Sequence, residues 1–189
     1  PRFVSDVYDI TKALDPTRPV CDVSGGVHVK TDIWTTHNYE QDPKKLKDII
    51  YNGKRWFQTP NHGVGFPQRN VGFNRHTETN IYAYPTYTEP NMPYLPDEVG
   101  GIKWVKGQDE QTGNDQKSWG YGEPPHSLEE FYTRLEGQVD ALMEIADNVW
   151  GYCYTQLTDV EQEQNGIYFY DRTSKFDMAR IRAIFSKKP

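Results

Sequence analysis

The chain has 189 residues, enough for one domain, and 27 Asp and Glu against 21 Lys and Arg give it a formal net charge of −6. Because it has no basic stripe and no apolar run of membrane-spanning length, we expect neither a nucleic acid nor a membrane as a partner. Hydrophobic residues make up only 35% of the chain, whereas 14% of it is aromatic. Such rings build a core, and they also suit the flat faces of sugars.

The two cysteines, Cys21 and Cys153, fall in segments that we expect to be buried strands, which predicts inert thiols. A disulfide between them stays open at this stage. Two cysteines provide neither a zinc spacing nor a redox motif, and His62 and His76 lie in a long loop without ligand spacing. We therefore predict no metal and no cofactor.

The first predicted element is a helix over residues 3–14, whose apolar side chains recur at steps of three and four. Two prolines then end the helix, and Val20–Ser24 reads as a buried strand that stops at a glycine pair. The chain therefore opens on a helix with no strand before it. In an alternating α/β fold, this is expected of a chain that begins within a domain.

A second strand is predicted over residues 31–39 and runs into the polar cluster His37-Asn38-Tyr39. Asp42 and Pro43 then begin a short helix that Gly53 is expected to end. Residues 54–92 lack periodicity and are rich in Gly, Pro and aromatic residues. We interpret them as a loop that covers a site, with a short strand near residues 81–84.

The stretch around which the chain is organised is residues 94–104, where a short apolar run leads to Glu98 and then to Gly100 and Gly101. In a parallel α/β fold, a carboxylate at this point lies at the carboxyl edge of the sheet, where such folds place their chemistry. For Glu98 alone, a solvated acid at a strand end is an equally good interpretation.

The last third of the chain continues the alternation of helices and strands. Ser127 and Glu130 form a capping box at the start of a helix that reaches Ala146. A nearly all-apolar strand over residues 149–156 follows, and a final helix over residues 176–185 closes the chain. Short apolar strands between amphipathic helices predict an α/β fold with parallel pairing.

Three stretches resemble the catalytic domain of the family 2 glycoside hydrolases, which include β-galactosidases and β-glucuronidases. They are Thr31–Tyr39, Asp97–Gly101 and Gly151–Gly166, and the last contains the unusual run Tyr-Thr-Gln-Leu-Thr-Asp-Val-Glu-Gln-Glu. The resemblance extends over nearly the whole chain. It implies a single domain, residues 1–189, that forms the C-terminal half of a (β/α)8 TIM barrel. Strands five to eight would then lie at residues 20–24, 33–39, 94–98 and 150–156.

The resemblance also implies the roles of individual residues. Glu98 matches the family's catalytic nucleophile, although Asp97 stands where the family has a small residue and Pro96 interrupts the strand. Strand alternation predicts that Asp97 points away if Glu98 faces the barrel mouth. Tyr39 resembles the tyrosine that binds the nucleophile, and Asp159, Glu161 and Glu163 are expected in a solvated loop. The implied substrate-binding residues are His37, Asn38, Tyr39, Trp104, Tyr154 and Gln156.

The family's acid/base Glu follows an Asn on the fourth strand, and the sequence contains no Asn-Glu pair. We therefore expect a fragment of a retaining exo-β-glycosidase, most similar to β-galactosidases, that binds a carbohydrate substrate but is inactive alone. The open barrel edges near Val20 and Tyr154 predict a homodimer. A non-catalytic carbohydrate-binding module is the alternative, and a different α/β hydrolase that uses His37 ranks last, because no Gly-x-Ser-x-Gly elbow is present.

Overall fold

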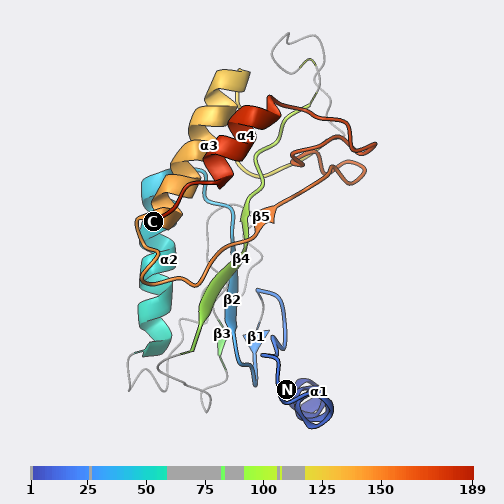
Figure 1. The fold of residues 1–189 in the computed structure, drawn as a ribbon, viewed down its shortest axis with the longest axis vertical. Coiled ribbons are helices and arrows are strands. Elements are labelled where there is room, and N and C mark those ends of the chain that lie inside the picture. The colour runs from blue at the N-terminus through green and yellow to red at the C-terminus, as the bar shows by residue number, and fades with distance from the viewer. Residues whose placement is uncertain (1, 26, 59–81, 84–91, 106, 108–117) are drawn as a thin grey trace.

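The computed structural model of the protein describes residues 2–25, 27–58, 82–83, 92–105, 107 and 118–189 (Figure 1). The predicted α/β class is confirmed. None of the helices in this part of the chain is long and apolar enough to cross a membrane. In chain order the elements are α1 (Arg2–Leu14), β1 (Val27–His28), β2 (Trp34–Asn38), α2 (Pro43–Gln58), β3 (Tyr82–Ala83), β4 (Tyr94–Gly100), α3 (Leu128–Met143), β5 (Tyr154–Thr155) and α4 (Met178–Phe185).

The central sheet has three strands in the order β2-β4-β5, and both pairings are parallel, as predicted. A second, two-stranded parallel sheet pairs β1 with β3, which lies within the short strand expected near residues 81–84. Because the strands of the central sheet run in one direction, the residues that follow β2, β4 and β5 meet at one edge. This edge carries the predicted site.

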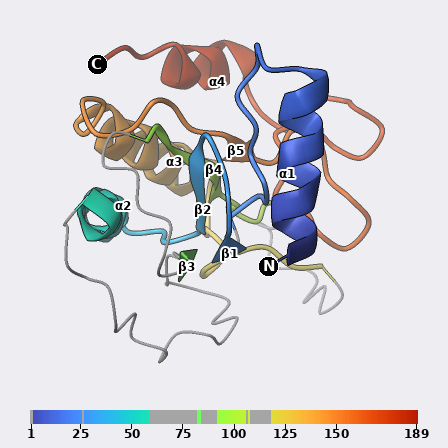
Figure 2. The same cartoon turned by 90° about the horizontal axis from the view of Figure 1, so that it is seen from below.

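Helices α2 and α3 cover one face of the central sheet, and α1 lies on the other side in both views (Figures 1 and 2). The core under these two helices is built from large side chains of the central sheet, α2 and α3. It contains Trp34, Tyr94 and Val99 from the sheet, Leu46 and Ile50 from α2, and Leu142 from α3. A second core joins α3 to α4, where the rings of Phe131 and Phe176 stack 4.1 Å apart.

Both predicted helix starts are confirmed. Ser127 Oγ accepts a hydrogen bond from Glu130 N at 3.1 Å, and Asp42 Oδ1 accepts one from Lys45 N at 3.0 Å. The Glu130 carboxylate reaches back to His126 N at 2.8 Å. The expected end of α2 at Gly53 is wrong, because the helix continues to Gln58.

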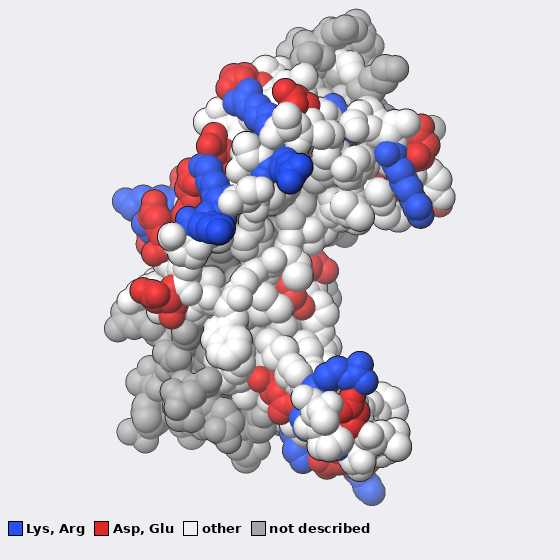
Figure 3. Space-filling view, viewed as in Figure 1, with Lys and Arg blue, Asp and Glu red and all other residues white. Residues whose placement is uncertain are grey.

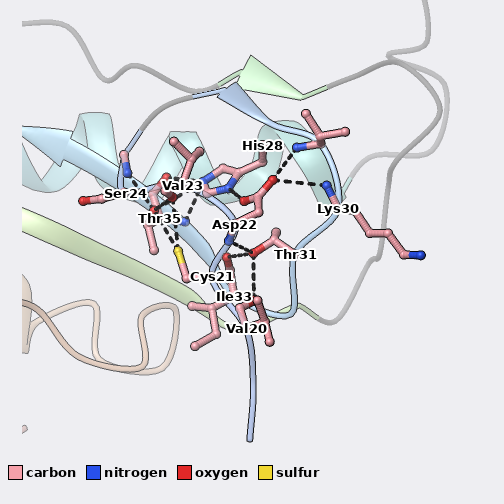
Figure 4. Close-up of polar contacts among 12 residues, drawn as sticks. Val20, Cys21, Asp22, Val23, Ser24, His28, Lys30, Thr31, Ile33 and Thr35 are labelled. Atoms are coloured by element: carbon pink, nitrogen blue, oxygen red, sulfur yellow. Dashed lines mark hydrogen bonds and ion pairs between the residues drawn. The ribbon is translucent and has the colours of Figure 1, made fainter. Parts of the chain in front are cut away.

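The predicted strand at Val20–Ser24 is not formed, and side chains satisfy its backbone instead (Figure 4). Thr31 Oγ1 donates to Val20 O and accepts from Asp22 N, while Thr35 Oγ1 donates to Val23 O. These local bonds compete with a sheet ladder. The expected fifth strand is therefore a bent segment, residues 20–25, that lies beside β2.

Helix α1 is confirmed, but its orientation reverses the expectation for an amphipathic helix. The apolar side chains at its predicted inner face are exposed, with Phe3 at 78% and Leu14 at 82%. The polar side holds the helix instead: Tyr8 donates to Asp32 at 2.6 Å, and Lys12 Nζ lies 3.1 Å from the same carboxylate. Within the described residues, nothing covers this apolar face.

The predicted eighth strand runs along β4, although only residues 154–155 are regular strand. Trp150 N donates to Tyr94 O at 2.8 Å, and Cys153 N donates to Pro96 O at 3.0 Å. Its expected burial on both faces is wrong, because Trp150 is 75% exposed and Cys153 is exposed. Cys21 is also exposed and both thiols are free, so the prediction of two buried cysteines is wrong as well.

Candidate active site

The candidate site begins with an irregularity in the pairing of β2 with β4. Thr36 lies opposite Pro96, but the next residue, His37, lies opposite Glu98. Asp97 is therefore an extra residue in β4, which is the arrangement of a β-bulge. A bulge interrupts the alternation of side chains along a strand, so two consecutive side chains can share one face.

This bulge corrects the expectation that Asp97 points away from Glu98. Both carboxylates contact the same imidazole: His37 Nε2 lies 3.5 Å from Asp97 Oδ1, and His37 Nδ1 lies 3.2 Å from Glu98 Oε2. Asp97 also accepts a hydrogen bond from Ser24 Oγ at 2.7 Å. The site therefore contains a row of polar groups: Ser24, Asp97, His37 and Glu98.

Tyr39 is the second predicted partner of Glu98, and it donates its hydroxyl to Glu98 Oε2. Its ring is stacked on that of Tyr121, with centroids 3.5 Å apart and planes 1° from parallel. Burial and the hydrogen bond to Glu98 raise the pKa of Tyr39 well above its usual range. Tyr39 therefore stays a hydrogen-bond donor at any ordinary pH.

Gly101 gives the Tyr39–Tyr121 pair its space. Its φ is +67°, and a Cβ there would lie 2.5 Å from Tyr121 Cδ2 and 2.7 Å from Tyr39 Cδ1. We expect Gly101→Ala to destabilise the protein by about 1–3 kcal/mol and to shift Tyr39 relative to Glu98. Chemical denaturation and near-ultraviolet circular dichroism measure both effects.

Gly107→Ala is the matched control, because Gly107 has a φ of +77° but a Cβ would meet no described residue within 4 Å. It shares the torsional cost of Gly101→Ala and lacks the clash. Equal stability and equal dichroism for the two variants would contradict the packing argument.

Sequence reasoning missed the environment of Glu163. This residue was expected in a solvated loop, but it is half-buried, and its backbone is bridged to exposed Trp119. Burial raises the pKa of Glu163, the hydrogen bond from Asn165 lowers it, and the charge of Glu98 raises it further, so the net pKa is raised. Trp119 in turn packs edge-on against Tyr121. The run of residues 154–163, which is part of the resemblance, was the available signal for Glu163.

The other predicted binding residues lie apart from the row. Trp104 is buried against Phe131 in the core of α3 and α4, because the chain turns inward after Gly101. Asn38 is buried and accepts a hydrogen bond from Glu40 N at 2.9 Å.

The two predicted binding residues from the β5 region also lie apart from this row. The ring of Tyr154 packs on Gly100 and Phe185. Gln156 Nε2 points to Glu163 O at 3.4 Å. Of the predicted set, the structure brings His37 and Tyr39 to Glu98.

Asp159 was also expected to be solvated, and this expectation is wrong. Asp159 is 5% exposed, and its Oδ1 lies 2.5 Å from Nζ of the buried Lys175. The same oxygen accepts from Gly166 N at 2.9 Å. Among the described residues no group of three or more His, Cys, Asp or Glu could hold a metal ion.

The surface of the protein is hollowed between α1 and the α3–α4 end, and acidic side chains lie in this hollow (Figure 3). Glu98 and Asp97 have side-chain exposures of 32% and 13%, so a ligand can reach both. Chemically, the arrangement offers an accessible carboxylate held by a tyrosine and a histidine. Comparisons with protein-family models and with curated proteins find no match to this chain.

Proposed function

We propose that this chain is part of a retaining β-glycosidase of the β-galactosidase type and that Glu98 is its nucleophile. The observation that carries the proposal is the fixation of one carboxylate oxygen. Glu98 Oε2 accepts from Tyr39 OH and lies 3.2 Å from His37 Nδ1, while the side chain stays partly exposed at the carboxyl end of β4. A preorganised, ionised and accessible carboxylate is what a nucleophilic displacement at a sugar requires.

In the proposed reaction, a Glu98 oxygen attacks the anomeric carbon of a terminal β-linked sugar. A bond forms between this carbon and the carboxylate as the glycosidic bond breaks, and the leaving oxygen takes a proton from a second carboxyl group. Water later attacks the same carbon and frees Glu98. Retention requires that the two carboxyl groups lie about 5–5.5 Å apart.

Asp97 does not fit the role of the proton donor. Burial alone would raise its pKa, but the hydrogen bonds with His37 and Ser24 outweigh this effect and lower it, so Asp97 is ionised. Glu163 has a raised pKa, yet it is already bonded to Asn165 Nδ2 at 3.1 Å. We therefore propose that the donor lies on a barrel strand outside these 189 residues and that the chain alone has no turnover.

The barrel itself is part of the proposal. In its support, the strands of the central sheet stand side by side in the order in which they occur along the chain, β2, β4 and β5, and are parallel, as barrel strands are. In addition, β2 has no strand on its other side within the described residues. The bent segment of residues 20–25 flanks β2 there through Thr35, so further barrel strands would lie beyond this segment and cover the exposed face of α1. A homodimer through the expected open edges near Val20 and Tyr154 is the alternative.

A mechanism-based reagent tests the nucleophile on the chain as it exists. A dinitrophenyl 2-deoxy-2-fluoro-β-galactoside needs no proton donor, because dinitrophenolate leaves unassisted, and the fluorine slows the release of the sugar. We expect a mass increase of one fluorosugar per chain, located by peptide mapping at Glu98. Glu98→Gln is the matched control and should stay unlabelled, and a label on another residue would contradict the assignment.

Two other functions are weaker. Exposed Trp119 favours a non-catalytic carbohydrate-binding module, which would bind sugar equally well after Glu98→Gln. A serine hydrolase is favoured by the spacing of Ser24 Oγ, 2.9 Å from His37 Nε2, with Glu98 on the opposite ring nitrogen. However, Ser24 donates its proton to Asp97, so it is not activated by His37.

A further inference from the structure

The hydrogen bonds around His37 determine where its protons are. Ser24 Oγ lies 2.7 Å from Asp97 Oδ2 and 2.9 Å from His37 Nε2. A carboxylate only accepts, so the single hydroxyl proton of Ser24 goes to Asp97, and Nε2 must donate to Ser24 Oγ. On the other side of the ring, Nδ1 lies 3.2 Å from the carboxylate oxygen Oε2 of Glu98. An oxygen that can accept a proton therefore faces each ring nitrogen, which is the arrangement that suits an imidazolium.

We infer that Asp97 is a positioning residue for Glu98 and acts through this imidazolium. This inference rests on the function proposed above and deepens it. Asp97 balances the positive charge on His37, and the Nδ1–H of His37 binds the same Glu98 oxygen, Oε2, as the hydroxyl of Tyr39. Among the described residues, no donor binds the other oxygen, Oε1. Oε1 is therefore the oxygen that attacks the sugar.

The backbone keeps His37 between the two carboxylates. The bulge places Asp97 and Glu98 side by side, and Gly25 brings the segment of residues 20–25 against the ring. A Cβ on Gly25 would lie 1.9 Å from His37 Cδ2, so a glycine is needed here to leave room for the ring. The backbone on both sides of the ring therefore places His37 beside the two carboxylates.

The charges around the ring agree with this assignment. Burial would lower the pKa of His37, but its contact with Asp97 and the charges of Glu98 and Asp97 outweigh this effect, so the net pKa of His37 is raised. The further titratable groups that act on this pair of carboxylates come from the neighbouring elements. They are Cys21 on the bent segment, Tyr39 after β2, Cys153 before β5 and Glu163 on the loop that follows β5, and Tyr94 on β4 itself also interacts with Asp97.

Nitrogen-15 NMR of the histidine rings tests the inference on the 189-residue chain. At pH 6.5, where an ordinary histidine is half protonated, we expect both His37 nitrogens to carry a proton in most molecules. The titration midpoint should lie above 6.5 and fall by about one pH unit or more in Asp97→Asn. Asp15→Asn, at a partly exposed carboxylate that pairs with Arg18 at the end of α1, is the control and should leave the midpoint unchanged.

A His37 ring that is mostly neutral at pH 6.5, or a midpoint that Asp97→Asn does not move, would overturn the inference. If Asp97→Asn fails to fold, the spectrum of the unaltered chain still decides the protonation state. The experiment contains no sugar. A failure here therefore removes the role of Asp97, whereas an unlabelled Glu98 in the fluorosugar experiment removes the glycosidase.

Discussion

Replacing Glu98 by Gln is expected to reduce glycoside hydrolysis by roughly 10³-fold or more, which corresponds to about 4 kcal/mol of lost transition-state stabilisation. The amide has the shape of the carboxylate and keeps an oxygen that can accept from Tyr39, but it cannot form the covalent intermediate. The measurement is the steady-state rate on a nitrophenyl β-galactoside, in an enzyme that unites this chain with the proposed proton donor. The stability of the protein should change little.

Glu144→Gln is the matched control, because Glu144 is exposed and its carboxylate pairs with Lys47 in the part of the chain that the structure describes. It makes the same chemical change far from the site and should keep the full rate. Glu98→Ala adds a second readout: azide can occupy the space of the missing carboxylate, and the product should be a glycosyl azide of inverted configuration. Retention of more than a tenth of the rate by Glu98→Gln would exclude Glu98 as the nucleophile.

The largest effect on stability is expected for Lys175→Met. The Lys175 side chain is fully buried, and its Nζ donates to Asp159 Oδ1 at 2.5 Å, to Trp104 O at 2.7 Å and to Gln164 O at 3.3 Å. Methionine fills a similar volume but leaves the Asp159 carboxylate buried without its counter-ion. Removing one partner of a buried pair costs about 3–5 kcal/mol, which lowers the Tm by about 6–20 °C in a domain of this size.

Thermal and denaturant unfolding followed by circular dichroism measure this loss. Lys187→Met is the control. Like Lys175, Lys187 pairs with carboxylates, here those of Glu136 and Asp140, but its side chain is partly exposed. Its loss should stay at or below about 1 kcal/mol. Asp159→Asn combined with Lys175→Met should recover part of the stability, because the buried charge is then removed. Similar Tm values for the two lysine variants would contradict the argument.

The predictions from sequence succeeded where one periodicity governed a segment. Helices α1, α3 and α4 form where their apolar residues recur at helical spacing, and α3 begins at the capping box of Ser127. The strands around Glu98 also form and pair in parallel, as their short apolar runs predict. The resemblance implied Tyr39 as a partner of Glu98, and His37 belongs to the polar cluster predicted at the end of the same strand. These features account for the elements and for the centre of the site.

The failures have tertiary causes that local patterns do not contain. Val20–Ser24 has the composition of a strand, but threonine and aspartate side chains ten or more residues away take its backbone groups. The apolar stripe of α1 predicted an inner face, yet the helix contacts the described residues through Tyr8 and Lys12, which both bind Asp32, and the stripe is exposed. The role of Asp97 depends on a pairing register, and register is a property of two strands that neither strand encodes alone.

The extra residue in β4 changes the spacing at which a strand can present chemistry. A regular strand offers side chains to one face about 6.6 Å apart, twice its rise per residue, which is wider than the two nitrogens of a single imidazole can span. With the bulge, neighbouring residues share the face, and one ring serves two acids. Deleting one residue at the bulge would restore the regular alternation of side chains. Only one carboxylate, in place of Asp97 and Glu98, could then face His37.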